Sequence, residues 1–442
     1  MAADPATAWQ AETASIRRAI LDHYGLTAGD AAVVLTPSGT DGELCALAVH
    51  RLGGAAAPSV NLLIAPEETG TGVVLAAAGR HFAEVTALGV AVAKGGPIDG
   101  LGEHVEIAAA AIRALDGAVR ATDAIDADVA RIADQAVAGG RRVLVHILDV
   151  SKTGLLAPSG GGVAALARRH GTAVDVLVDA CQARLSAASL RDYLAAGYMV
   201  LITGSKFFTG PPFSGALLLP PAIAARLVGG RLPSGLAAYV SGLDWPSAGG
   251  GAMPVAVNHG LVLRWTASLA EMRAFAAVPP ALCRHVIDSF CRRIADAIAA
   301  NPDLVPHAAP PPARARDDWD ARQTVFSFSV RAPGGGLLDL DALRRLYRAL
   351  NRDLSPLIGG SASLLAARCC HIGQPVALGG AHAALRLAAG ARLVSGVHGD
   401  PALGPTVEVR LAREIADACL ALDKISLVLR HADLLSAAER GG

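Results

Sequence analysis

The feature of this 442-residue sequence that most restricts its fold is a series of short apolar runs separated by segments with helical periodicity. The apolar runs lie at 31–35, 60–64, 143–148, 173–178 and 199–202. The helical segments lie at 43–52, 107–115, 126–138 and 162–169. Apolar runs of this kind are typical of strands buried on both faces of a parallel sheet that helices cover. The pattern therefore predicts a large α/β domain over residues 30–270, with a mainly parallel sheet between layers of helices.

A smaller unit is predicted after the Pro-rich stretch 307–314, which we interpret as a loop. Beyond it, alternating strand patterns and helical patterns lie at 324–330, 338–350, 384–387 and 407–429. These segments predict an α+β domain at 306–442. Connecting helices are expected at 271–305, and a helical segment is expected at 1–29.

Charge and hydropathy exclude several classes of protein. The 39 basic and 39 acidic side chains cancel, so no excess positive charge exists to neutralise nucleic-acid phosphates. Mean hydropathy is +0.41, but Gly, Pro or charge interrupts each apolar run before the roughly 20 residues that a membrane-spanning helix needs. The seven cysteines are odd in number and scattered, and the N-terminus shows no signal peptide. We therefore expect a cytoplasmic protein with free thiols that binds neither nucleic acid nor membranes.

Two stretches at the expected ends of strands carry candidate chemistry. Ser38, Gly39 and Thr40 follow a strand and open a helix, where small hydroxyl residues and free N–H groups can hold an anion. The same residue types also form ordinary N-caps. Asp179 ends an apolar strand, which is where α/β proteins bind ligands, although an Asp there can also cap the next turn.

A third stretch places Lys206 directly after the apolar run 199–202. Burial disfavours the charge of a lysine, and a lysine in a dry pocket can form Schiff bases, although a lone lysine is more often a solvated loop residue. Lys206 lies 27 residues after Asp179. A phosphate cradle, an acid and a lysine together suit pyridoxal 5′-phosphate, which needs a site for its phosphate, its ring nitrogen and its aldehyde.

Around these residues the sequence resembles the fold-type I pyridoxal-phosphate enzymes, and most closely the aminotransferase class V family, which includes the cysteine desulfurases. Asp179-Ala-Cys-Gln182 is similar to the family's Asp-x-x-Gln element. The stretch 203–217 is similar to its lysine loop, in which Gly-x-Lys is followed by Gly-Pro and Gly-x-Leu. The resemblance covers roughly residues 30–400. It implies the family's large and small domains and a homodimer with the active site near the subunit interface.

The resemblance implies a role for each matching residue. Lys206 would hold the cofactor as a Schiff base and move the α-proton of an amino acid substrate as general base and acid. Asp179 would keep the ring nitrogen protonated, and Gln182 would hydrogen-bond the ring hydroxyl. Arg386 would clamp the substrate carboxylate, with Arg392 as the competing candidate. The phosphate would be bound by the loop that begins at Ser38, through Gly39, Thr40, Thr203 and Ser205. The resemblance also places Thr209 and Gly210 near the dimer interface.

Two segments depart from the family pattern near the expected cofactor ring. Family members often stack an aromatic residue or His on the ring from a segment a few dozen residues after the phosphate loop, but the stretch 65–72 has no aromatic residue, which leaves Glu68, Thr69 or a residue from elsewhere to cover the ring. The family's Asn-Asn-Glu-Thr-Gly stretch reads Val-Ser-Lys-Thr-Gly at 150–154. Asp149 or Ser151 would then replace the asparagine that touches the ring hydroxyl.

A pair of cysteines resembles the desulfurase loop that carries a nucleophilic thiol. Aligned on the Gln-Pro pair at 374–375, the nucleophile position holds Ile372, and Cys370 falls two residues early. We interpret Cys369 and Cys370 as buried structural cysteines. A metal site at these cysteines and His371 would have too tight a spacing and lacks partners, so no metal is expected.

These observations predict an enzyme that uses pyridoxal phosphate to act on an amino acid. The reaction that they favour is transamination. Elimination or desulfuration of a cysteine-like substrate is the alternative reaction. A NAD-binding oxidoreductase is a hypothesis of another class, because Gly70-Thr-Gly72 resembles the start of a Gly-x-Gly-x-x-Gly motif, but the third glycine is missing. A further hypothesis is a homologue that binds the cofactor without catalysing a reaction. The sequence does not identify the pocket for the substrate side chain.

Overall fold

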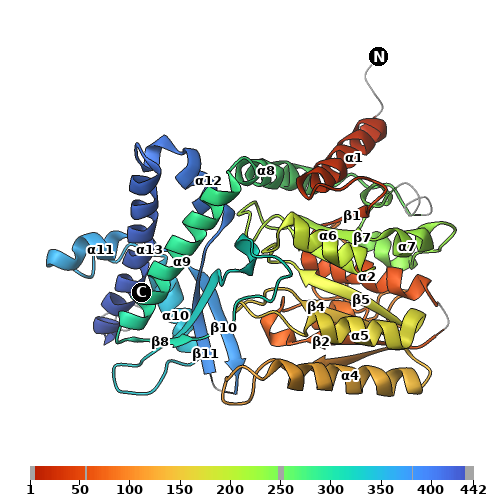
Figure 1. Ribbon diagram of the computed structural model, residues 1–442, viewed down its shortest axis with the longest axis horizontal. Coiled ribbons are helices and arrows are strands. Elements are labelled where there is room, and N and C mark those ends of the chain that lie inside the picture. Colours follow the sequence, from red (N-terminus) through yellow and green to blue (C-terminus); the bar gives the residue numbers. More distant parts are fainter. Residues whose placement is uncertain (1–4, 55–56, 247–252, 381, 434–442) are drawn as a thin grey trace.

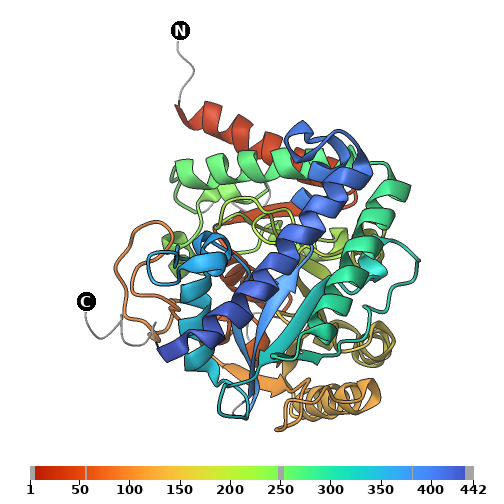
Figure 2. The ribbon, with the colours of Figure 1, turned by 90° about the vertical axis from the view of Figure 1, so that its left-hand side faces the viewer.

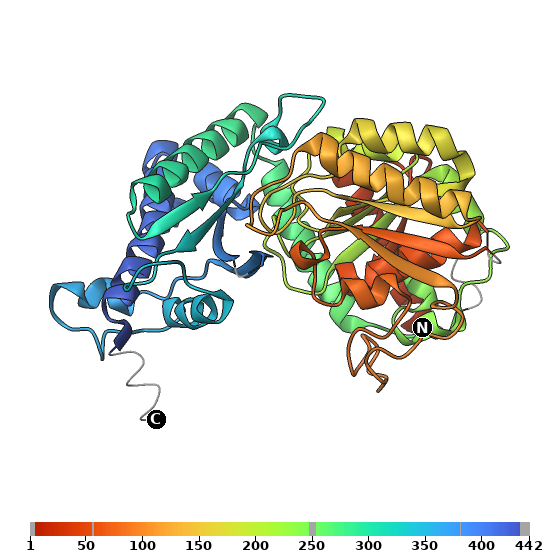
Figure 3. The ribbon, with the colours of Figure 1, turned by 90° about the horizontal axis from the view of Figure 1, so that it is seen from below.

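The chain folds into two lobes, each built on one β-sheet (Figure 1, Figure 3). The structure is a computed structural model that describes residues 5–54, 57–246, 253–380 and 382–433. Within these ranges, no helix has both the length and the apolar character needed to cross a membrane.

The first lobe contains a sheet that has seven strands within the described ranges. They are β1 (Ala32–Thr36), β2 (Ser59–Ile64), β3 (Val105–Ala110), β4 (Arg142–Leu148), β5 (Val174–Ala180), β6 (Met199–Thr203) and β7 (Gly215–Leu219). Their order across the sheet is β1-β7-β6-β5-β4-β2-β3. β7 runs antiparallel to both of its neighbours, whereas the other neighbouring pairs are parallel.

Helices cover both faces of this sheet (Figure 3). They are α1 (Pro5–His23), α2 (Gly39–Leu52), α3 (Val73–Ala77), α4 (Thr122–Ala138), α5 (Gly160–His170), α6 (Ala187–Ala195), α7 (Pro221–Ala224) and α8 (His259–Ala276). Successive strand residues face opposite sides, so Leu177 packs in the core cluster that contains α2, whereas Val176 and Val178 pack with α4, α5 and α6. Burying one such side chain contributes about 1.5–3 kcal/mol, which explains why the central strands are continuously apolar.

The second lobe is built on an antiparallel sheet that has four strands in the part of the chain described. They are β8 (Leu304–His307), β9 (Val325–Val330), β10 (Gly373–Gly379) and β11 (His382–Ala388), in the order β10-β11-β9-β8. Its helices are α9 (Pro280–Ala300), α10 (Leu340–Leu350), α11 (Ser363–Ala367), α12 (Ala391–Gly399) and α13 (Val407–Arg430). The long helices α9 and α13 pack against each other beside this sheet (Figure 2).

The predicted fold class is confirmed: an α/β lobe with a mainly parallel, helix-covered sheet precedes a smaller α+β lobe. One element was predicted wrongly, because 107–115 was expected to be helical and instead contributes to the edge strand β3. Its alanines favour a helix, but parallel pairing with β2 outweighs that preference. The domain boundaries stay predictions. Helix α9, expected to be a connecting segment, packs on β8 and β9 of the second sheet.

Candidate active site

A cavity of about 420 Å³ lies between the two lobes, at the carboxyl ends of β5 and β6 and the start of α2. Most of its lining comes from the first lobe, and the second lobe contributes Gln374 and Arg386. Nine of the residues for which the sequence predicts a cofactor or substrate contact line it: Ser38, Gly39, Thr40, Asp179, Gln182, Thr203, Ser205, Lys206 and Arg386. The fold thus gathers positions that are nearly 350 residues apart in sequence (38 to 386) around one space.

The start of α2 provides backbone donors to this cavity. Ser38 is the N-cap, and its hydroxyl oxygen accepts from Asp41 N at 3.2 Å. The next N–H groups, those of Gly39 and Thr40, have no hydrogen-bond acceptor among the described residues. A Cβ on Gly39 would lie 2.4 Å from the Cys181 Sγ, so a larger residue would force the Cys181 side chain to shift. Free N–H groups at a helix N-terminus form a site for an anion such as phosphate.

Asp179 lies at the floor of the cavity, near the end of β5. Its Oδ1 accepts from Cys181 N at 3.1 Å, and it forms no ion pair within the described ranges. Burial, reinforced by the negative charge of Glu43, raises the pKa of Asp179, and the charge of His146 acts against this rise. A carboxylate whose ionised form is disfavoured in this way gains stability when a cation, such as a protonated ring nitrogen, lies beside it.

Behind Asp179 lies a buried polar group that the sequence analysis missed. His146 Nε2 lies 2.7 Å from Asn61 Oδ1 and 3.2 Å from Glu43 Oε1. Asn61 Nδ2 donates to Glu43 Oε1 at 3.1 Å. Burial alone would lower the pKa of His146, but the charge and hydrogen bond of Glu43 raise it above its ordinary value. The sequence signal was available, because Asn61 and His146 are polar residues inside otherwise apolar strands.

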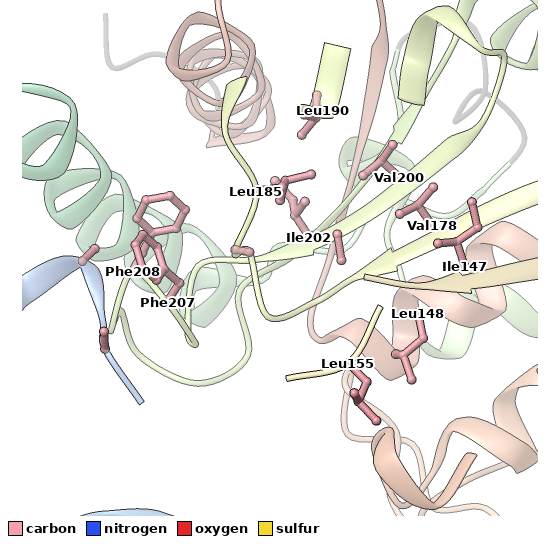
Figure 4. Packing of buried hydrophobic residues seen from close by; sticks show 14 of the residues in the cluster. Ile147, Leu148, Leu155, Val178, Leu185, Leu190, Val200, Ile202, Phe207 and Phe208 are labelled. Carbon is pink, nitrogen blue, oxygen red and sulfur yellow. The ribbon is translucent and has the colours of Figure 1, made fainter. Parts of the chain in front are cut away.

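Lys206 lines the cavity three residues beyond the end of β6. Its side chain is exposed in the single chain, contrary to the dry position expected from the sequence, because the loop after β6 carries it past the edge of the sheet. Both following residues, Phe207 and Phe208, are buried (Figure 4). The Phe207 ring stacks on Trp319, with centroids 4.6 Å apart and planes 10° apart. This aromatic packing anchors the loop that presents the lysine.

The backbone of Phe207 connects the lysine loop to both lobes. Phe207 N donates to Gln182 O at 3.2 Å, and Ala391 N, from the second lobe, donates to Phe207 O at 2.7 Å. Thr203 Oγ1 donates to Cys181 O at 2.7 Å, so its hydroxyl proton is already engaged. The Ser205 hydroxyl makes a longer contact of 3.4 Å with Thr203 Oγ1 and is the freer of these two donors.

Gly210 and Thr209, predicted to lie near a dimer interface, differ in exposure. Gly210 is buried within the chain, where an added Cβ would lie 2.2 Å from the Ser268 Oγ of α8. Thr209 is exposed and has φ +56°, in the left-handed region. Their place at an interface stays a prediction.

Arg386 of β11 reaches the cavity from the second lobe. Its Nε donates to Gln374 O at 3.0 Å, and its Nη1 donates to Lys152 O at 3.0 Å. Burial lowers the pKa of Arg386. The competing candidate, Arg392, is exposed, pairs with Glu271 and does not line the cavity. The geometry therefore favours Arg386 for contact with a substrate carboxylate.

Glu68, one of the residues considered for covering the cofactor ring, is fully engaged elsewhere. Its buried carboxylate pairs with Arg113 Nε at 2.7 Å and accepts from the hydroxyls of Ser151 and Thr153. The other candidate, Thr69, lines the cavity and donates to a backbone carbonyl. Glu68 thus fixes a turn rather than presenting a free side chain.

Asp149 does not line the cavity, unlike its alternative Ser151. Its carboxylate forms a two-pronged ion pair with Arg314, at 2.6 and 2.7 Å, and accepts from the Tyr193 hydroxyl at 2.8 Å. Arg314 comes from the Pro-rich loop, where no sequence pattern marks it as a partner of Asp149. The role proposed for Asp149 at the ring hydroxyl is therefore without geometric support.

The paired cysteines lie at a different cavity, of about 490 Å³, in the second lobe. Cys369 is exposed and Cys370 is partly buried, so the expectation that both are buried was wrong. The reason is that they follow the short helix α11 in a surface segment. Among the described residues, no group of three or more His, Cys, Asp or Glu side chains is arranged to hold a metal ion.

The Gly70–Gly72 segment does not form the strand-to-helix turn of a dinucleotide site. It follows the 3-10 turn Pro66–Glu68 and leads into α3, which has five residues. Gly70 lines the same cavity as Lys206.

No family model and no curated protein matches the sequence. Solved structures do match. The cystine C-S lyase C-DES in complex with cysteine persulfide has a TM-score of 0.53 and 15% identity, covering 93% of this chain and 87% of that one. Serine palmitoyltransferase from S. paucimobilis with a bound PLP–myriocin aldimine has a TM-score of 0.52 and 12% identity, covering 94% and 77%. A NifS-like protein from Rickettsia africae has a TM-score of 0.50 and 11% identity, covering 96% and 91%.

The chain has the fold of the fold-type I pyridoxal-phosphate enzymes. At these identities the likeness concerns the fold. Lys152, for which the sequence predicts no role, lines the cavity beside Arg386. Lys152 was visible in the Val-Ser-Lys-Thr-Gly stretch, but nothing in the sequence showed that the turn carrying it contacts Arg386.

Proposed function

We propose that this protein is a pyridoxal-phosphate-dependent aminotransferase, related to class V, that acts on an amino acid through Lys206. The observation that carries the proposal is the convergence of the Lys206 amine, the Asp179 carboxylate and the N-terminus of α2 on a single cavity. These groups fit the aldehyde, the ring nitrogen and the phosphate of the cofactor. The N–H groups of Gly39 and Thr40, which have no acceptor among the described residues, provide donors for the phosphate.

Each residue then has a defined task. Gly39, Thr40 and Ser205 bind the phosphate, Asp179 holds the ring nitrogen in its protonated form, and Gln182 binds the ring hydroxyl. When bound, the cofactor supplies an electron sink for the pair of electrons left at the substrate Cα.

Lys206 and Arg386 act on the substrate itself. The Arg386 guanidinium binds the α-carboxylate and so orients the Cα–H bond. The Lys206 amine removes the proton from Cα and donates it again in a later step of the same reaction. The lysine is therefore both general base and general acid.

We propose transamination rather than desulfuration because of the positions of the cysteines. A desulfurase needs a thiolate that reaches the substrate sulfur, whereas Cys370 lies at the other cavity. Burial also raises the pKa of Cys370, which disfavours its thiolate. Products distinguish the two reactions: transamination yields a keto acid and aminated cofactor, whereas elimination or desulfuration releases ammonia or sulfide.

The test is the visible spectrum of the purified protein after incubation with pyridoxal phosphate. We expect a Schiff-base band that borohydride abolishes, leaving a phosphopyridoxyl group on the peptide that contains Lys206, as seen by mass spectrometry. The variant Lys206→Ala should lack both, whereas Lys94→Ala, at an exposed lysine outside the cavity, should keep both. Absence of the band in the wild-type protein, or label on another lysine, refutes the proposal.

We also propose that the active form is a homodimer, since Lys206, which lines the cavity, and Thr209 of the same loop are both exposed in the single chain. Light scattering of the purified protein tests this directly, and a monomer that retains activity refutes it.

A further inference from the structure

Lys152 is held in a turn between the two lobes. The turn follows β4, and Lys152 itself is half-buried and lines the active-site cavity. Its backbone N–H donates to Glu68 O at 3.3 Å, and its carbonyl accepts from Arg386 Nη1 at 3.0 Å. Its ammonium group has no hydrogen-bond or ion-pair partner in the part of the chain that the structure describes. The lysine is therefore tied through its backbone while its charge stays available.

The neighbours of Lys152 make this turn rigid. The side chains of Ser151 and Thr153 both donate to the buried carboxylate of Glu68, and Thr153 Oγ1 also accepts from Arg113 Nη2 at 2.8 Å. Val150 has φ +60°, a left-handed conformation that a β-branched residue adopts only when its surroundings enforce it. A lysine in such a turn is presented to the cavity in one backbone position, unlike a lysine in a free surface loop.

The cationic side chains that line the cavity form no ion pair with the carboxylates that line it. Glu68 is already paired with Arg113, Glu43 is bound to His146, and Asp179 lies at the floor, where the cofactor ring nitrogen is proposed. The cationic side chains that line the cavity are Lys152, Lys206 and Arg386. None of the three has an ion-pair partner among the described residues.

If Lys206 holds the cofactor, two cations remain for the substrate. Burial, followed by the positive charges of Arg386 and Lys206, lowers the pKa of Lys152. An anion placed between these groups would relieve that repulsion. A single α-carboxylate satisfies one cation, so the second cation fits a second acidic group.

We propose that Lys152 and Arg386 form a two-cation substrate site, so that the amino acid substrate carries a second carboxylate or a comparable anionic group. This inference rests on the proposed function. Arg386 binds the α-carboxylate, and Lys152 binds the distal acidic group. Lys152 is then the residue that selects the substrate side chain, which no sequence motif identified.

The experiment compares acidic amino acids with their amides on the protein loaded with pyridoxal phosphate. For the wild-type protein, kcat/KM for aspartate or glutamate should exceed that for asparagine or glutamine by about 10- to 100-fold, as a charge-assisted hydrogen bond allows. In Lys152→Gln this ratio should fall to about one, while kcat/KM for alanine changes by less than about threefold. Lys152→Arg should keep the preference for acids, and Lys94→Gln should match the wild type.

A binding measurement separates substrate recognition from catalysis. By calorimetry, glutarate should bind the loaded wild-type protein at least about tenfold more tightly than butyrate, and Lys152→Gln should lose that difference. The affinity for pyridoxal phosphate, measured by fluorescence titration, should be the same in both proteins.

Three results overturn the inference. They are a wild-type protein without a preference for acids, a Lys152→Gln variant that loses all substrates equally, and a variant whose cofactor affinity falls. The last result would assign Lys152 to the cofactor instead. If the wild-type protein shows no Schiff-base band, the proposed function fails as well. If the band is present and no acid is preferred, only the two-cation site fails.

Discussion

Asp244 is a buried acid whose ionisation should destabilise the folded protein at neutral pH. It ends the 3-10 turn Gly242–Asp244, its side chain is buried, and its Oδ2 accepts from Ser241 N at 2.8 Å. Burial raises the pKa of Asp244 to about 7, although the hydrogen bond from Ser241 and the charge of Arg17 act in the opposite direction. The replacement Asp244→Asn keeps a hydrogen-bond acceptor and removes the charge.

The size of the effect follows from the two pKa values. In the unfolded chain this carboxyl has its ordinary pKa of 3.8, so at pH 5 it is mostly ionised there while the folded protein keeps it protonated. Between pH 5 and pH 7 the folded state therefore binds about one more proton, and its free energy of unfolding falls by about 1.4 kcal/mol per pH unit. The stability from this group is lost as pH rises to about 7, and the total loss is about 2–3 kcal/mol.

Urea unfolding of the wild-type protein and Asp244→Asn at pH 5 and pH 8 measures this loss. Groups that titrate in both proteins cancel in the comparison, so the wild-type protein should lose about 2–3 kcal/mol more than the variant between the two pH values. The matched control is Asp22→Asn, at an exposed position on α1, which should follow the wild type. A variant that loses as much stability as the wild-type protein would refute the argument from burial.

Two further substitutions test the site and its support. Gly39→Ala places a Cβ 2.4 Å from the Cys181 Sγ and should weaken pyridoxal-phosphate affinity about tenfold in a fluorescence titration. Adding Cys181→Ala should restore part of the affinity, whereas unchanged affinity in the single variant would contradict the close packing. Arg314→Met leaves Asp149 buried without a cation and should lower the free energy of unfolding by about 3–5 kcal/mol. Arg316→Met removes an exposed ion pair and should lower it by less than about 1 kcal/mol. Similar losses in the two variants would show that burial does not matter there.

The sequence predicted the first sheet well because a strand buried on both faces has to be apolar along its whole length. The prediction failed at β3, where an edge strand of alanines carries no such signal. It also missed β7, β8 and β10, since β7 follows the Gly- and Pro-rich lysine loop, β8 has four residues, and β10 begins Gly-Gln-Pro, which resembles a loop. These strands depend on pairing with distant partners, and pairing is not written in local composition.

The candidate site was predictable where chemistry depends on residue type at a strand end. Asp179 and Lys206 follow apolar strands, and both line the cavity. Lys152 and Arg314 were not predictable, because their positions depend on how a turn and a loop meet other parts of the chain. Arg314 pairs with a residue 165 positions away.

The bond from Ala391 N to Phe207 O has a mechanical consequence. It ties the backbone next to Lys206 to the second lobe, while the bond from Phe207 N to Gln182 O ties it to the first. A hinge motion that changes the width of the cleft must therefore move the backbone beside Lys206 or break one of these two hydrogen bonds. The width of the cleft and the position of the backbone that carries Lys206 are therefore coupled through Phe207.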